Sequence, residues 1–435
     1  MNIEELYQVY CQHPLVTTDS RNCPQGSVFF ALKGEKFDGN AYARQALEAG
    51  CAAAVVDDPE VAADERFILV PDVLQALQQL AALHRQEWGG PVLQITGTNG
   101  KTTTKELISA VLARKFNVLS TQGNLNNHIG VPLTLLRLTA GHDLAVVETG
   151  ANHPGEIAQL CRIVQADYGL ITNVGRAHLE GFGSFEGVKA TKGELYDDLS
   201  QRGGKAFLNA FDDDLVQMAQ ARGLKLHETA LPYVEGRVSE ASPFLAFQWR
   251  ADVDDDWHSV QTRLVGAYNI DNVRASVSVG LYFGVSADQI DQAITDYVPR
   301  NSRSEFRQSA RNRLIVDAYN ANPSSMAAAL TNFLFVQDAH KMVILGDMQE
   351  LGQESEAEHR KVLRQLADLH AELIWLVGPK FRQAAEEAGF AHPGLRFFPD
   401  AAAVKASLEA EPVEGFTILI KGSNSMRLHE LPGLL

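Results

Sequence analysis

A glycine-rich turn between an apolar strand and a helical stretch constrains this chain more than any other feature. Residues 92–96 form a mostly apolar run typical of a buried strand, and Gly97, Gly100, Lys101 and Thr102 follow it. Glycine lets the backbone curl so that consecutive N–H groups point at phosphate oxygens, and the helix N-terminus adds partial positive charge. Lys101 is expected to reach the β- and γ-phosphates and Thr102 to offer a hydroxyl to Mg²⁺. The turn predicts a nucleotide-binding domain.

The spacing of this turn departs from the common phosphate loop. That pattern would have glycine at position 95, where this chain has Ile95, and its first glycine is Gly97. The alternative is an ordinary strand–turn–helix junction rich in Gly and Thr. Gly-Lys-Thr at the start of a helix favours the phosphate-binding interpretation.

The length and the order of the apolar runs predict three α/β domains. A chain of 435 residues is long enough for about three domains of roughly 150 residues each. We expect boundaries at 1–86, 87–299 and 300–435. Apolar runs alternate with helical stretches in each segment, which indicates mainly parallel sheets. The fold class is therefore α/β, with a central parallel-sheet ATPase domain and a C-terminal Rossmann-like domain. Residues 232–264 alternate differently and are expected to form an antiparallel excursion at the edge of the central sheet.

Composition narrows the class of protein and its location. The formal net charge is −16, which argues against a general nucleic-acid or anionic-membrane binder. The first residues show no signal peptide, and no apolar run reaches the roughly 20 residues that a membrane span needs. The four cysteines have neither zinc-type spacing nor the density of a disulfide scaffold. We expect a cytoplasmic protein with reduced thiols, no nucleic-acid partner and no membrane insertion.

Several longer stretches resemble one known family. Residues 97–102 are similar to the shortened phosphate loop of the Mur ligase and folylpolyglutamate synthase superfamily. Further resemblance to the Mur ligases lies in every segment of the chain, at 18–21, 30–39, 123–132, 148–157, 177–184, 189–194 and 317–323. Within that family the chain resembles the ligases that add D-alanyl-D-alanine to UDP-N-acetylmuramoyl-tripeptide.

The resemblance implies an ATP-dependent ligase of cell-wall peptidoglycan synthesis. The tripeptide carboxylate would be phosphorylated to an acyl phosphate, and the amine of D-alanyl-D-alanine would displace the phosphate. ATP and two Mg²⁺ ions are the implied cofactors, and hinge closure of the third domain and a monomeric protein are expected. The phosphate loop would contribute Gly97, Thr98, Asn99, Gly100, Lys101, Thr102 and Thr103 to the nucleotide site.

Three positions beyond the loop are expected at the metal and reaction centre, where Lys101, His178 and Lys192 would be catalytic. Glu148 ends an apolar run where a core residue would be Val or Ile, and with Thr102 it resembles a magnesium ligand; a capping or surface glutamate is the alternative. His178 is a ligand only through the resemblance, because Mg²⁺ prefers oxygen. Lys192 would react with CO₂ to form a carbamate that binds a second Mg²⁺. Such a reaction needs a neutral amine; Lys189 is the competing position, and a solvated helix lysine is the alternative.

Other positions are expected at the ends of the nucleotide. Asn269 carries donors and an acceptor that suit the adenine edge, although it also suits a helix cap. By resemblance Asp317 contacts the ribose and Arg303 reaches across from the hinge, with Ser302 replacing the usual glycine before it.

The substrate positions are implied by the resemblance alone, and turn chemistry is the alternative for those in the first two segments. Ser20 and Arg21 would contact the uridine diphosphate. Lys421 and Ser423 would lie near the reacting carboxylate, with Asn424 in place of the usual arginine. The remaining expected contacts are with the sugar-peptide, by Asn126, Asn127 and His128, and with the dipeptide, by Tyr319, Asn320 and Asn322.

Two alternative functions remain to be weighed against this one. One is a sister ligase that adds a single amino acid or polyglutamylates folate, against which residues 124–128 and 319–323 weigh. The other is a nucleotide-binding regulatory module without ligase activity, which the presence of Glu148 and His178 disfavours.

Overall fold

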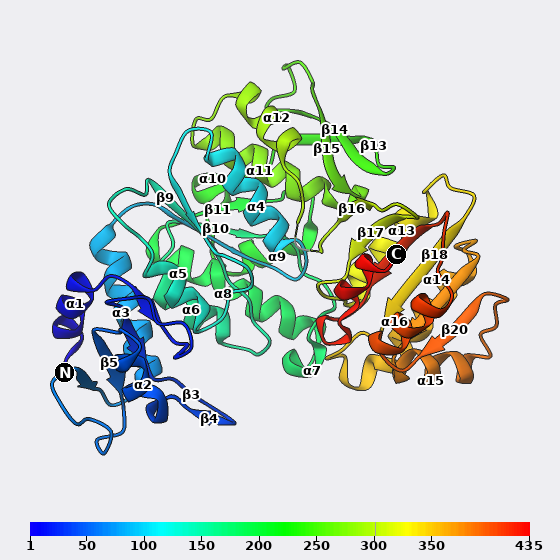
Figure 1. Cartoon of the computed structure of the whole chain (residues 1–435). Coiled ribbons are helices and arrows are strands. Elements are labelled where there is room, and N and C mark those ends of the chain that lie inside the picture. Colours follow the sequence, from blue (N-terminus) through cyan, green and yellow to red (C-terminus); the bar gives the residue numbers. More distant parts are fainter. Residues whose placement is uncertain (301) are drawn as a thin grey trace.

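The computed structural model describes residues 1–300 and 302–435 and contains three α/β units in a row (Figure 1). The first unit is a four-stranded parallel sheet of order β1-β2-β5-β6 with helices on its faces. The strands are β1 (Val16–Thr17), β2 (Val28–Phe30), β5 (Ala53–Val56) and β6 (Phe67–Leu69), with a small hairpin of β3 (Lys33–Gly34) and β4 (Phe37–Asp38). The helices are α1 (Ile3–Gln12), η1 (Gly39–Tyr42), α2 (Ala43–Glu48) and α3 (Val73–Trp88).

The central unit is a six-stranded parallel sheet of order β12-β11-β10-β7-β9-β8. Its strands are β7 (Val92–Thr96), β8 (Val118–Ser120), β9 (Leu144–Glu148), β10 (Tyr168–Ile171), β11 (Lys205–Leu208) and β12 (Ala230–Pro232). The helices are α4 (Lys101–Leu112), α5 (Gly130–Leu135), α6 (Glu156–Val164), α7 (Leu179–Phe182), α8 (Phe185–Arg202), α9 (Asp213–Ala221), α10 (Leu226–Thr229), η2 (Ala267–Asn269), α11 (Ile270–Tyr282) and α12 (Ala287–Asp296).

The antiparallel segment after β12 differs from the expected extension of the central sheet. Strands β13 (Glu235–Glu240), β14 (Phe244–Arg250) and β15 (His258–Val265) are antiparallel, as predicted, but they form a separate three-stranded sheet. Every second residue of β14 is buried, including Phe247 and Trp249, which belong to the same hydrophobic cluster as residues of α11 and α12. The sheet therefore covers these helices, because burying that face there removes more apolar surface from water than lengthening an edge would.

The third unit is a six-stranded sheet of order β16-β17-β21-β18-β19-β20, parallel except for β16. Its strands are β16 (Glu305–Gln308), β17 (Arg313–Asp317), β18 (Lys341–Gly346), β19 (Leu373–Val377), β20 (Leu395–Phe398) and β21 (Thr417–Lys421). The helices are α13 (Pro323–Leu334), η3 (Gly352–Glu354), α14 (Ser355–Ala367), α15 (Pro379–Ala388), α16 (Ala401–Ala410), η4 (Asn424–Met426) and η5 (Leu428–Gly433). The α/β class predicted from the sequence is confirmed.

The first two units share one hydrophobic core. Leu77 on α3 is fully buried in the same cluster as Leu135 and Val147 of the central unit. Arg85, only 6% exposed, donates from Nε to the carbonyl oxygen of Val164 (3.1 Å) and from Nη2 to Asp167 (2.8 Å). Helix α3 runs through the expected boundary between residues 86 and 87, and the boundaries stay predictions.

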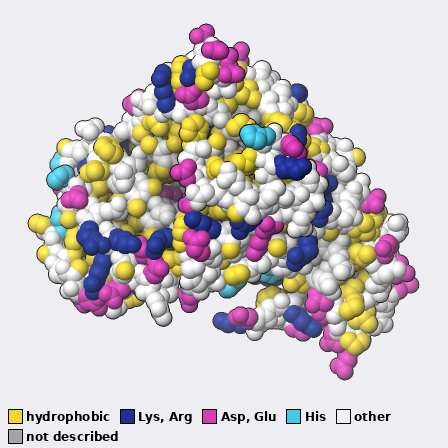
Figure 2. Space-filling model, turned by 180° about the vertical axis from the view of Figure 1, so that it is seen from behind, with side chains coloured by type: hydrophobic (Ala, Val, Ile, Leu, Met, Phe, Trp, Pro, Cys, Tyr) yellow, Lys and Arg dark blue, Asp and Glu magenta, His cyan; other side chains and the backbone are white. Residues whose placement is uncertain are grey.

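Charged side chains of both signs are intermixed over the face seen in Figure 2. Many form exposed ion pairs such as Arg396–Glu411 and Arg66–Asp64, and exposed pairs of this kind contribute little to stability. The buried clusters therefore stabilise the fold. No helix in the described part of the chain has both the length and the apolar character needed to cross a membrane.

The Arg85 contacts predict which single substitution loosens the first unit from the second. Arg85→Ala removes the donor of the Val164 and Gln165 carbonyl oxygens and the ion pair with Asp167, and it should cost about 3 kcal/mol of stability. The exposed Arg162→Ala on α6 is the matched control and should stay within about 0.5 kcal/mol of wild type. Thermal unfolding followed by circular dichroism measures both variants, and equal midpoints would contradict this account.

Candidate active site

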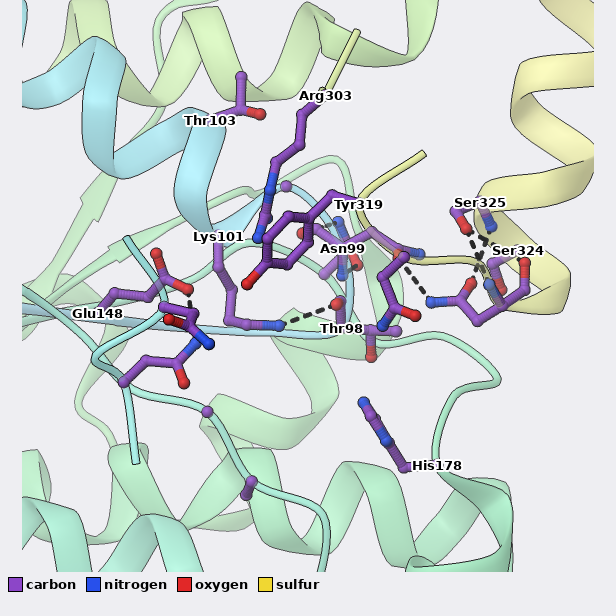
Figure 3. Close-up of a pocket in the computed structure, with 18 of the residues that line it drawn as sticks. Thr98, Asn99, Lys101, Thr103, Glu148, His178, Arg303, Tyr319, Ser324 and Ser325 are labelled. Carbon is purple, nitrogen blue, oxygen red and sulfur yellow. Dashed lines mark hydrogen bonds between the residues drawn. The ribbon is translucent and has the colours of Figure 1, made fainter. Parts of the chain in front are cut away.

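A cavity of about 570 Å³ lies where the carboxyl ends of the central strands face the third unit. Figure 3 shows side chains from both units converging on it, with Arg303 and Tyr319 reaching toward Lys101. Most of the predicted site residues line the cavity: Thr98, Asn99, Gly100, Lys101, Thr103, Asn126, Asn127, His128, Glu148, His178, Asn269, Arg303, Asp317, Tyr319, Asn320, Asn322 and Lys421. Gly97, Thr102, Lys192, Ser20, Arg21 and Ser423 are not among its lining residues.

The phosphate loop adopts a conformation that requires glycine. Gly97 has φ +140°, and a Cβ atom there would lie 2.0 Å from Thr172 Oγ1. Gly100 has φ +78°, and its Cβ would lie 2.5 Å from Asn272 Oδ1. The loop is also tied to β10, because Asn99 N donates to Asn173 Oδ1 at 3.0 Å. The conformation of the loop therefore depends on two glycines with positive φ and on its contacts with the residues that follow β10.

Lys101 is the first residue of α4 and caps its own loop. Its Nζ donates to the carbonyl oxygens of Gly97 (2.8 Å) and Thr98 (3.0 Å). Burial lowers the pKa of Lys101 to about 8, the nearby charge of Glu148 opposes this shift, and Arg303 adds to it. A phosphate anion bound beside Lys101 would stabilise the charged form of the lysine, because its negative oxygens would offset the cost of burying the ammonium group.

Glu148 fits a magnesium ligand. It ends β9, is 1% exposed, and its Oε1 accepts from Thr102 Oγ1 (3.1 Å) and Asn126 Nδ2 (2.8 Å). The other oxygen, Oε2, is buried without a hydrogen-bond partner. A buried, unpartnered carboxylate oxygen beside the loop threonine provides the hard oxygen donors that Mg²⁺ prefers. Among residues 1–300 and 302–435, no three His, Cys, Asp or Glu side chains form a cluster able to hold a metal alone.

Lys192 fits the carbamate chemistry. It lies on α8, is 2% exposed, and its Nζ has one weak contact, to the carbonyl oxygen of Ala151 at 3.4 Å. The pKa of Lys192 is well below its usual value, mainly because of burial and further because of the charge of Lys101. A neutral amine is the form that reacts with CO₂, so the environment suits the predicted modification. The competitor Lys189 instead pairs with Asp214 at 2.6 Å.

His178 lies at the junction with the third unit. Its backbone has φ +51°, a left-handed conformation that is unfavourable for a residue with a Cβ, and its ring contacts the Glu350 carboxylate. The next residues along the chain bind the third unit too: Arg176 Nη1 lies 2.8 Å from Glu354, and Glu180 N donates to the carbonyl oxygen of Glu350 at 3.2 Å. His178 is therefore at the cavity and joins the two units.

The residues predicted for the ends of the nucleotide all line the cavity. The Arg303 guanidinium stacks on the Tyr319 ring at 3.8 Å. Asn269 is 1% exposed and its amide is engaged, since Nδ2 donates to the carbonyl oxygen of Val265 (2.9 Å). The hydrogen bonds of Asn269 are those of a structural asparagine.

The residues predicted for the dipeptide, together with Lys421 from the group predicted near the reacting carboxylate, form the wall of the cavity on the third unit. Lys421 is buried and donates to Asp317 Oδ2 at 2.6 Å, across the paired strands β17 and β21. Asn322 caps α13 and also donates to Asn99 Oδ1 at 2.8 Å, so it ties the wall to the phosphate loop. Ser423 lies behind the wall and accepts from the backbone N–H of Gln349 at 2.9 Å.

The residues predicted for the nucleotide sugar are only partly brought to the cavity. Asn127 and His128 line it and are exposed. Arg21 is exposed and pairs with Asp19 in the first unit at 2.9 Å, and neither it nor Ser20 lines the cavity. These assignments stay predictions.

Several lining residues were not found from the sequence. Asn173 and Ser304 contact the loop and Asn269, and Asn152 and Glu156 line the end of the cavity near Lys192. Asn173 follows a predicted strand, so its position at the edge of the sheet could have been found. Ser304 and Asn152 come from loops and Glu156 from the start of α6, and their approach to the cavity depends on how the helices pack.

Comparison with known proteins identifies three matching domains. The Mur ligase family catalytic domain matches residues 14–85, the Mur ligase middle domain matches 95–280, and the glutamate ligase domain of Mur ligases matches 302–424. These stretches fall one within each of the three units.

Relatives and solved structures match nearly end to end. UDP-N-acetylmuramoyl-tripeptide–D-alanyl-D-alanine ligases of Escherichia coli and Bacillus subtilis are 35% and 33% identical, each over 96% of this chain and 92% of theirs. A crystal structure of MurF from Acinetobacter baumannii superposes with a TM-score of 0.84 at 34% identity, covering 96% of this chain and 92% of its own. MurF of Thermotoga maritima in complex with ADP gives 0.82 at 25% identity, covering 97% and 96%.

The loop geometry predicts that Gly97→Ala weakens nucleotide binding. A Cβ 2.0 Å from Thr172 Oγ1 must displace the loop or the end of β10, and the N–H groups would no longer converge. We expect at least a tenfold weaker affinity for ADP in isothermal titration calorimetry, roughly 1.4 kcal/mol or more. Gly433→Ala, where the new Cβ meets nothing within 4 Å, is the control; similar affinities in both variants would refute the prediction.

Proposed function

The chain belongs to the Mur ligase family, and we propose that it joins D-alanyl-D-alanine to UDP-N-acetylmuramoyl-tripeptide. The reaction uses ATP and gives the pentapeptide precursor of peptidoglycan. End-to-end similarity to ligases of that name supports this substrate pair. The observation that carries the proposal is the convergence of Lys101 and Glu148 on one cavity that the third unit closes on the other side. Lys192 is buried behind this cavity, where its Nζ contacts the carbonyl oxygen of the lining residue Ala151.

The chain's own residues provide the charge that phosphoryl transfer requires. Lys101 would leave the carbonyl oxygens of its loop and bind phosphate oxygens, while the N–H groups of the loop orient the phosphates. Thr102, Glu148, His178 and the Lys192 carbamate would hold Mg²⁺, which neutralises the charge on the transferring phosphoryl group.

The reaction proceeds in two displacements. An oxygen of the tripeptide carboxylate attacks the γ-phosphorus of ATP, the bond to ADP breaks, and an acyl phosphate forms. The neutral amine of the dipeptide then attacks the acyl carbon, the C–O bond to phosphate breaks, and the amine loses a proton as the amide forms. Water would hydrolyse the acyl phosphate, so a closed cavity is required.

The third unit is positioned to provide that closure. Asn322 contacts Asn99 of the phosphate loop, and Glu350 and Glu354 contact the segment that carries His178. A hinge movement near residue 300 would open and close this contact, and a change in the radius of gyration on adding ATP, substrates and Mg²⁺ would reveal it. We further propose a cytoplasmic location, since ATP and a nucleotide-linked precursor are cytoplasmic reactants. We also propose that the protein is a monomer.

An amine-selectivity assay tests the proposed function. Purified protein with ATP, Mg²⁺, bicarbonate and UDP-N-acetylmuramoyl-tripeptide should release phosphate with D-alanyl-D-alanine, and the product mass should increase by one dipeptide unit. D-alanine, L-lysine and L-glutamate should not support release. Turnover with one of these amines would change the assigned substrate, and ATP hydrolysis indifferent to every amine would favour the regulatory module instead.

Lys192 and Lys189 provide a matched pair for testing the carbamate. With ¹³C-bicarbonate, a carbamate carbon signal should appear in wild type and in Lys189→Ala and be absent from Lys192→Ala. The activity of Lys192→Ala should fall by about 100-fold or more, because a charged group at the transition state is lost. A signal that persists in Lys192→Ala would assign the modification elsewhere.

A further inference from the structure

Three carboxylates line the cavity, and the contacts or the proposed role of two of them account for their presence there. Asp317 is paired with Lys421 at 2.6 Å. Glu148 accepts from Thr102 and Asn126 and is assigned above to Mg²⁺. Glu156, the first residue of α6, also lines the cavity, and neither the nucleotide nor the metal accounts for it.

The two carboxylate oxygens of Glu156 differ in the number of hydrogen bonds that they accept. Oε2 accepts the backbone N–H groups of Asn152 (2.7 Å) and His153 (3.1 Å). Oε1 has a single described contact, with His153 Nδ1 at 3.3 Å. Burial acts to raise the pKa of Glu156, but the hydrogen bonds from Asn152 and His153 outweigh it and the pKa is lowered. The group is an ionised carboxylate with hydrogen-bonding capacity left on the oxygen that the loop does not use.

Glu156 lies close to the predicted reaction centre. Its Oε2 accepts from the backbone N–H of Asn152 (2.7 Å), the residue after Ala151, and the carbonyl oxygen of Ala151 lies 3.4 Å from Lys192 Nζ.

The same helix leads toward the first unit. One turn further along α6, Gln159 lines the cavity and donates to Gln78 on α3 at 3.4 Å. Gln78 in turn donates to the carbonyl oxygen of His128 (3.0 Å), a residue predicted for the sugar-peptide. Glu156 therefore lies beside the part of the cavity assigned to the sugar-peptide.

We propose that Glu156 binds the side-chain ammonium of the third residue of the tripeptide and so determines which tripeptides are accepted. This inference rests on the proposed function. The first two residues of the tripeptide have their amino groups in amide bonds, so the diamino acid at the third position carries its one free ammonium. The carboxylate that reacts belongs to that same residue, which must therefore lie beside Lys101 and Lys192. A carboxylate at this place matches the ammonium in charge and hydrogen bonding.

A comparison of paired substrates tests the proposal. One pair has L-lysine or L-norleucine at the third position, and the other has meso-diaminopimelate or L-2-aminopimelate; each pair differs by the distal amino group. Wild type should favour the amine-bearing member of the pair that it accepts by about tenfold or more in kcat/KM, since hydrogen bonds to charged groups are worth that much. Glu156→Gln should lose this preference while the KM for D-alanyl-D-alanine stays unchanged.

Glu194→Gln is the matched control. Glu194 also caps the N-terminus of α6, accepting from Gly155 N (2.8 Å) and Ala158 N (2.7 Å), but it does not line the cavity. Loss of a capping charge alone would affect both variants similarly, whereas the proposal predicts that Glu194→Gln keeps the preference. Glutamine at 156 retains an acceptor for the two backbone N–H groups, so the loop should keep its shape.

Calorimetric titration of the same tripeptides separates this inference from the proposed function. A preference retained in Glu156→Gln, or absent from wild type, in both turnover and binding would overturn the role of Glu156. Tripeptide binding with the expected preference, but without amine-dependent phosphate release, would support Glu156 and overturn the ligase proposal.

Discussion

The parallel pairing of β7 with β9 is the constraint on which the site depends. In this register Ile95 lies opposite Glu148, so the strand that leads into the phosphate loop and the strand that ends in the carboxylate stop at the same edge of the sheet. Thr102 and Glu148 are 46 positions apart in the chain and are still joined by a 3.1 Å hydrogen bond. Shifting β9 by one residue would turn Glu148 to the opposite face and remove it from the loop.

Several buried ionisable groups gather at this edge of the sheet, and among the residues that the structure describes Lys101, Lys192 and Glu148 each lack an opposite charge in direct contact. Burial lowers the pKa values of Lys101 and Lys192, and the charge of Lys101 lowers the pKa of Lys192 further. Burying such groups costs stability unless they are paired. The unpartnered Oε2 of Glu148 has the same character. The phosphates and the divalent cation proposed for this site would balance these charges.

The third unit meets the central unit through two kinds of contact. Near the cavity they are polar: Asn322 donates to Asn99, and Arg176 pairs with Glu354. Behind the cavity they are apolar, because Val265 of β15 belongs to the buried cluster of the third unit. The first and second units share a larger apolar cluster. Water can replace the polar contacts at the cavity more readily than a shared core, so a hinge movement would open that side.

The sequence by itself determined the α/β class, the phosphate loop with Lys101 and the place of Glu148 at a strand end, because these depend on local patterns: an apolar run, a glycine turn and a polar residue after a strand. Lys192 was implied by the family resemblance alone. The sequence did not determine that β13–β15 form their own sheet, since alternation predicts strands but not which surface they cover. Nor did it find Glu156, whose motif is visible at 148–157 but whose position beside Lys192 depends on how α6 packs on α8. Asn269 matched its family position, yet only the tertiary structure decided that its amide is engaged by Val265. Local patterns specify elements and their ends, whereas contacts between elements depend on packing that no short stretch of sequence encodes.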